Sequence, residues 1–121
     1  MKPPILMPPR PGVPFLLYLD PTSTTMGAML AQYLPESRKE NAIYYLSKKM
    51  TEGEVSYSTI EKSCLALVWA TRKLRHYLLT APVWLVSRMN PLKYLFEKPA
   101  LVGRTSKWLL LLSEFDITYV T

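Results

Sequence analysis

The stretch STIEKSCLALVWATRKLRHYL, residues 58–78, predicts one long amphipathic helix. Ser58 stands three residues before Glu61, which is the capping-box pattern of a helix N-terminus. Residues that suit a buried face then recur at close to a helical period, and Pro82 ends the element. These residues are Ile60, Cys64, Leu67, Val68, Thr71, Leu74 and Leu78. The apolar face of such a helix needs a second layer to cover it, and the flanking segments supply one.

Three short apolar segments precede this helix and predict strands. They cover residues 13–20 (VPFLLYLD), 26–33 and 42–49. The turn PTSTT and a polar loop at residues 35–41 join them. Short connections of this kind are typical of an antiparallel meander.

The segments after the long helix complete the pattern. They predict a fourth strand at 83–87, a short helix from Pro91 to about Glu97, a helix at 103–114 and a fifth strand at the end (FDITYV). Because a helical crossover leads to the fourth strand, it joins the meander in a mixed sheet. The order predicts an α/β fold with a mixed five-stranded sheet and flanking helices.

Composition agrees with one folded domain. The chain has 121 residues, of which 49% are hydrophobic and 20% charged, as is ordinary for a globular protein. No apolar run reaches the roughly 18 residues of a membrane span. Residues 1–12, MKPPILMPPRPG, hold five prolines and predict an extended linker, with a frayed tail as the alternative. Cys64 is the single cysteine of the chain, so an internal disulfide is excluded.

A net charge of +6 permits binding to a polyanion such as nucleic acid. The candidate contacts are basic residues that either face phosphates or form an ordinary solvated surface: Lys48, Lys49, Lys62, Arg72, Lys73 and Arg75. The tryptophans at positions 69, 84 and 108 and the thiol of Cys64 are expected in the core. His76 has no partner at metal-ligand spacing, so a zinc site is not predicted.

Three phrases carry a family resemblance. FLLYLDPTSTTMGAMLAQ, AIYYLSKKMTEGEVSYSTIEKSCLALVWATRKLRHYL and WLVSRMNPLKYLFEKPALVGRTSKWLLLLSEFDITYV follow one another from about Leu6 to the end. In order and spacing they resemble the RNase H-like domain of gypsy-type, plant-like LTR retrotransposon reverse transcriptase polyproteins. The resemblance implies an RNase H-like fold over residues 13–121, incomplete at its C-terminus. It also implies an intracellular protein, in the cytoplasm or nucleus.

The family activity implied is hydrolysis of the RNA strand of an RNA–DNA hybrid. Its cofactors would be magnesium or manganese, and two-metal hydrolysis needs several carboxylates around the ions. The implied partners are the hybrid and the polymerase domain of the same polyprotein, with no membrane.

Two of the four family acids match this sequence. Asp20 in YLDPT matches the first acid, and Glu61 in STIEKS matches the second. The third family acid is the Asp of a phrase that usually reads TDHNPLK. Here the phrase reads SRMNPLK, and Arg88 stands in place of that Asp. The fourth position lies beyond Thr121. Without the resemblance, Asp20 would be read as a turn residue and Glu61 as the capping-box acid.

Three interpretations follow for the function. The first is a catalytically impaired domain that acts as a structural tether and grips the hybrid. The second is a working metal-dependent ribonuclease H that takes missing acids from elsewhere. The third is a decayed transposon fragment without activity.

Overall fold

The computed structural model describes residues 7–97 and 103–120. Three strands form the first half of the fold: β1 (Phe15–Pro21), β2 (Thr25–Leu34) and β3 (Lys39–Lys49). The helices α1 (Glu52–Val55), α2 (Thr59–Lys73) and α3 (Arg75–Leu78) lead from there to β4 (Val83–Val86). The second half ends with α4 (Pro91–Glu97), α5 (Gly103–Leu112) and β5 (Ile117–Val120).

The five strands form one sheet in the order β3-β2-β1-β4-β5. β1 pairs antiparallel with β2, and β2 antiparallel with β3. β1 pairs parallel with β4, and β4 parallel with β5. The predicted mixed five-stranded sheet with flanking helices is therefore confirmed.

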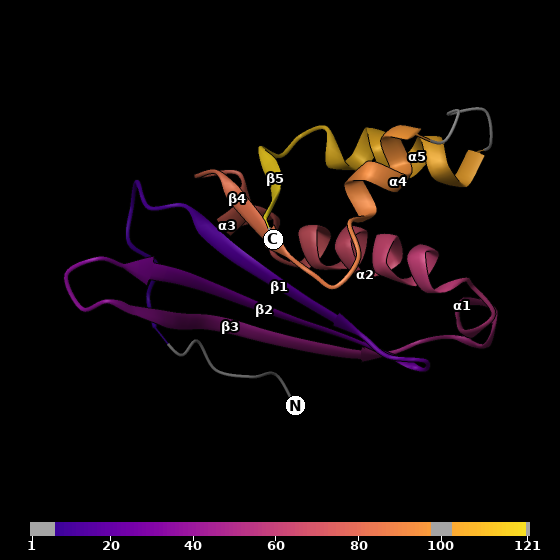
Figure 1. Ribbon diagram of the computed structural model, residues 1–121, viewed down its shortest axis with the longest axis horizontal. Helices are drawn as coiled ribbons and strands as arrows, with labels where there is room; N and C mark the ends of the chain where they lie inside the picture. The colour runs from indigo at the N-terminus through magenta and orange to yellow at the C-terminus, as the bar shows by residue number, and fades with distance from the viewer. Residues whose placement is uncertain (1–6, 98–102, 121) are drawn as a thin grey trace.

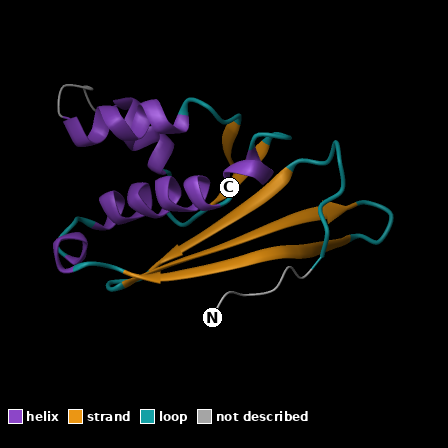
Figure 2. Ribbon diagram, turned by 180° about the vertical axis from the view of Figure 1, so that it is seen from behind, coloured by secondary structure: helices purple, strands orange, loops and turns teal. Residues whose placement is uncertain are grey.

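The helices α2, α4 and α5 lie on the same side of the sheet (Figures 1 and 2). Strand alternation turns Leu17 of β1 and Leu85 of β4 toward this side, and both side chains are fully buried. From the helix, Leu67 and Ala70 meet them in one hydrophobic cluster. Each large side chain buried in this way contributes roughly 1.5–3 kcal/mol to folding.

Two features of the helical region differ from the sequence prediction. The long helix predicted over residues 58–78 is wrong at its C-terminal end, because Leu74 leaves the helical region (φ −105°, ψ 17°) and α3 begins after it. The bend keeps both Leu74 and Leu78 in the core, at 2% and 1% exposure. The helix α1 was not predicted, although Thr51 and Glu54 form a capping box of the same kind as that of α2.

The strands hold two further corrections. β3 begins at Lys39, so part of the predicted loop at residues 35–41 is strand, and a bulge opposite Leu30 and Ala31 absorbs the difference. Trp69 and Trp108 are buried as predicted, whereas Trp84 is 43% exposed. The core prediction is wrong for Trp84 because it alternates with the buried Val83 and Leu85 and so faces the side of the sheet opposite α2.

The proline-rich segment is fastened to the sheet where the structure describes it. The buried amide of Gln32, in β2, accepts a hydrogen bond from the backbone N–H of Arg10 at 2.8 Å. Its nitrogen donates to the carbonyl oxygens of Arg10 and Val13, each at 3.0 Å. One buried side chain thus satisfies three backbone groups of a segment that cannot form a helix.

Replacing Gln32 with alanine should lower the free energy of unfolding by about 1–3 kcal/mol, because buried backbone groups lose their partners. Urea unfolding measures the change. Asn41, which faces Gln32 across the β2–β3 pair and makes no side-chain hydrogen bond to a described residue, is the matched control. An equal loss from Asn41→Ala would show that the amide clamp is not the cause.

Candidate active site

Asp20 lies at the carboxyl end of β1, with an exposed side chain. The chain turns back directly after it, and Thr22 closes the turn by donating its N–H to the carbonyl oxygen of Thr25 at 2.8 Å. In addition, the N–H of Met50, just past β3, donates to the carbonyl oxygen of Thr24 at 2.8 Å. The end of β1 is therefore held by two elements, and Asp20 projects from a fixed backbone.

Glu61 occupies the first turn of α2 and is half-buried. Its carboxylate accepts the backbone N–H of Ser58 at 3.0 Å, and the Ser58 hydroxyl accepts the N–H of Glu61 at 3.3 Å. The next residue, Lys62, donates from its ammonium to the carbonyl oxygen of Ser23 at 2.7 Å. This bond joins the start of α2 to the β1–β2 turn, so Glu61 and Asp20 belong to the same end of the molecule.

Arg88 follows β4, and its side chain is exposed. In the parallel pair of β1 and β4, Tyr18 stands opposite Val86. Two residues farther along each chain, Asp20 and Arg88 reach the same carboxyl edge of the sheet. Among the described residues, no ion pair joins their side chains at 4.0 Å or less.

The donor set at this edge does not fit a two-metal site. Within residues 7–97 and 103–120, no group of three or more His, Cys, Asp or Glu side chains is placed to hold a metal ion. Asp116 does not supplement the set, because its carbonyl oxygen accepts the N–H of Val83 at the amino end of β4. Two carboxylates, with a guanidinium at the third family position, are a poor match for ions that require several oxygen ligands.

The candidate phosphate contacts fall in different places. Lys48, Arg72 and Lys73 line one groove along α2. The Lys62 ammonium is bonded to Ser23. Arg75 pairs with Glu114 at 3.1 Å and 3.3 Å, and this hydrogen bond raises the pKa of the Arg75 guanidinium. By strand alternation, Lys49 faces the side of β3 opposite Lys48.

Residues 10–115 match the family model described as the RNase H-like domain found in reverse transcriptase. The chain belongs to this family. Among its relatives is the retrovirus-related Pol polyprotein from transposon 297 of Drosophila melanogaster, 34% identical over 99% of this chain and 11% of the polyprotein. The transposon Tf2-3 polyprotein of Schizosaccharomyces pombe is 29% identical over 84% of this chain and 8% of its own length. The domain thus spans about a tenth of the polyproteins it matches.

Solved structures show the same fold. The foamy viral protease-reverse transcriptase in complex with dsDNA superposes with a TM-score of 0.73 at 19% identity, over 95% of this chain and 24% of that one. The same viral protein in complex with an RNA/DNA hybrid gives 0.66 at 23% identity, over 89% and 15%. The prediction of an RNase H-like domain of a retrotransposon reverse transcriptase is confirmed, and its assignment to gypsy-type, plant-like elements stays a prediction.

RNase H-like domains generally use divalent metal ions. Membership of the family supports the cofactor prediction to this extent. Among the described residues of this chain, no helix is both long and apolar enough to cross a membrane.

Replacing Ser58 with alanine should lower the free energy of unfolding by about 0.5–2 kcal/mol, because α2 loses its N-cap and half of the box that orients Glu61. Thermal or urea unfolding measures the loss. Thr51→Ala removes the same kind of cap from the four-residue α1 and should cost less. A larger loss from Thr51→Ala would contradict the importance assigned to the start of α2.

Cys64 supplies a pH-dependent prediction. Burial, followed by the nearby charge of Glu61, raises the pKa of the Cys64 thiol from 9.0 to about 12. The folded state therefore favours the neutral thiol, and the resulting stability is present below pH 9 and lost as the pH rises toward 12. Over this pH range, the unfolding free energy of the native chain should fall relative to that of Cys64→Ala. An unchanged difference would contradict the raised pKa.

Proposed function

We propose that this domain has lost metal-dependent cleavage of RNA and serves its reverse transcriptase as a structural unit that grips an RNA–DNA hybrid. The observation that carries the proposal is the position of Arg88. It lies two residues past Val86, the last residue of β4 that pairs with β1, and Asp20 lies two residues past Tyr18, the β1 partner of Val86.

The chemistry of this exchange opposes metal binding. Arginine in place of an aspartate changes the local charge by about two units and removes an oxygen ligand. A guanidinium at this position supplies no oxygen ligand, and its positive charge repels a metal ion instead of attracting one. Asp20 and Glu61 are the residues that would hold magnesium or manganese if the domain were active.

The intact fold supports a structural role. The core along α2 is closely packed, and its side chains include Leu17, Leu67 and Leu85 at 0% exposure. A fragment that had decayed freely would be expected to accumulate polar substitutions at such positions, since each costs stability. The described core holds only three buried polar residues: Gln32, Ser63 and Thr71.

The partners follow from the relatives. The viral neighbours are reverse transcriptases described in complex with dsDNA and with an RNA/DNA hybrid. The transposon relatives are polyproteins about ten times as long as this chain. We therefore assign the hybrid and the polymerase part of the same polyprotein as the partners of this domain.

A working ribonuclease is the second candidate, because Asp20 and Glu61 both remain at one end of the molecule. It would need further acids from outside residues 7–97 and 103–120.

A labelled RNA–DNA hybrid, incubated with the native chain and magnesium or manganese, should remain uncut. The Arg88→Asp variant should bind manganese more tightly than the native chain, because it regains a third carboxylate and loses a competing cation. Gel electrophoresis measures cleavage, and isothermal titration measures metal binding. Arg88→Gln is the matched control, since it removes the cation without adding a ligand.

Cleavage by the native chain that Asp20→Asn abolishes would establish an active ribonuclease and refute the proposal. Equal manganese binding by the native chain and Arg88→Asp would show that Arg88 is not what weakens the site.

A further inference from the structure

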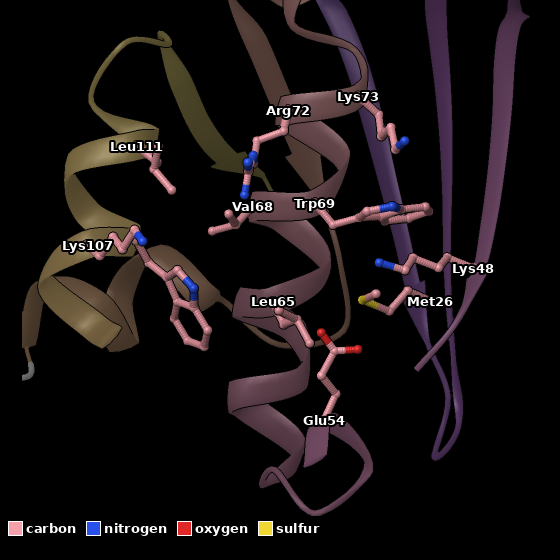
Figure 3. A pocket seen from close by; sticks show the side chains of 11 residues that line it. Met26, Lys48, Glu54, Leu65, Val68, Trp69, Arg72, Lys73, Lys107 and Leu111 are labelled. Carbon is pink, nitrogen blue, oxygen red and sulfur yellow. The ribbon is translucent and has the colours of Figure 1, made fainter. Parts of the chain in front are cut away.

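A groove of about 540 Å³ runs along the outer face of α2. Leu65 and Val68 of α2 lie along it, Lys48 comes from β3 on one side, and Lys107 comes from α5 on the other (Figure 3). None of Asp20, Glu61 and Arg88 lines it. The groove is therefore separate from the candidate active site.

The groove carries uncompensated positive charge. Lys48, Arg72, Lys73 and Lys107 line it, and all four side chains are exposed. Among the described residues, none of the four has an ion pair or side-chain hydrogen bond. Glu54 is the one acid in the lining, and its carboxylate already accepts the N–H of Thr51 at 2.9 Å. Four cations against one carboxylate leave a net positive potential that attracts anions.

A hydrogen-bond donor without an acceptor lies between two of these cations. Trp69 is 91% buried, since its exposure is 9%, and its indole N–H has no partner among the described residues. Figure 3 shows the indole nitrogen between the ammonium ends of Lys73 and Lys48. The nitrogen atom is screened from water in this conformation, so an acceptor would reach it only after the side chains around it move. A buried donor without a partner is uncommon in native proteins and calls for an explanation.

We infer that this groove binds the phosphodiester backbone of a nucleic-acid strand without reading its sequence. Ammonium and guanidinium groups on both walls suit a ligand that carries one negative charge per nucleotide. The rings of Trp69 and Trp108 are 9% and 7% exposed, so they offer no face for stacking on bases. A phosphate oxygen between Lys48 and Lys73 would also supply the acceptor that the Trp69 N–H lacks.

This inference rests on the proposed grip on a hybrid and says where the grip lies. Lys107, on α5, extends the contact set beyond the residues that the sequence indicated. Lys62 and Arg75 drop out of the set, because each already has a partner in the fold. Lys49 drops out because it faces the opposite side of β3.

The first test compares two triple variants of equal charge. One replaces the groove cations Lys48, Lys73 and Lys107 with glutamine. The other replaces Lys39, Lys49 and Lys93 with glutamine. These three lysines are exposed and do not line the groove. Fluorescence anisotropy with a labelled RNA–DNA hybrid, measured over a salt series, gives the affinity and its salt dependence for each.

The groove variant should bind more weakly than the control variant, and its salt slope should fall by about three, one for each phosphate contact removed. Equal binding by the two variants would refute the groove and leave the proposed function standing. No binding by the native chain would refute both the groove and the proposed grip. If polyglutamate displaced the labelled hybrid as readily as unlabelled hybrid does, the groove would bind acidic peptides, and the inference that it binds nucleic acid would be refuted.

A second test uses the native chain, so it does not depend on whether a variant folds. Nitrogen-15 NMR reports the indole N–H of each tryptophan, and Trp69→Phe assigns the peak of residue 69. On titration with hybrid, the Trp69 peak should shift more than that of Trp84, which lies on the opposite face of the sheet. A shift confined to Trp84 would place the contact on that opposite face and overturn the inference.

Discussion

The packing of α2 on the centre of the sheet is the constraint on which the rest of the fold depends. The helix contacts β1, β2, α4 and α5, so every layer of the molecule meets it. Its start is tied to the β1–β2 turn through Lys62 and Ser23. Farther along, the Cys64 thiol lies 3.8 Å from the carbonyl oxygen of Pro91, where α4 begins. The positions of Asp20, Glu61 and Arg88 are therefore consequences of burying one helix face, whatever chemistry those side chains perform.

This separation explains how a site can change while its scaffold persists. The parallel pairing of β1 and β4 is made by backbone groups and by buried side chains such as Leu17 and Leu85. Arg88 lies beyond the last paired residue and is exposed, so its identity costs the fold little. Function resides in the site and not in the fold. A sheet of this kind can thus keep its geometry when a residue at the site is exchanged.

The sequence predicted the strands and their order along the chain because short apolar runs and turn residues are local signals. It also predicted the start of α2, since a capping box lies within four residues. The break at Leu74 could not be seen in the same way, because the periodicity continues through it and tertiary burial of Leu78 decides the bend. For the candidate site, Asp20, Glu61 and Arg88 came from family phrases. Of the groove cations, Lys48, Arg72 and Lys73 were among the candidate contacts, whereas Lys107 was missed because it is far from Lys48 in sequence and reaches the groove only in the fold.

In the function proposed above, Arg88 and the groove cations act in the same direction. Carboxylates at the edge of a nucleic-acid surface repel phosphates unless metal ions neutralise them, so an RNase H site without its metals would weaken binding. Arg88 removes part of that repulsion, while the groove along α2 adds attraction at a separate place. The net charge of +6 is consistent with both effects. Under the proposed function, a domain that holds a hybrid without cutting it needs this balance, because its affinity would not depend on bound metal.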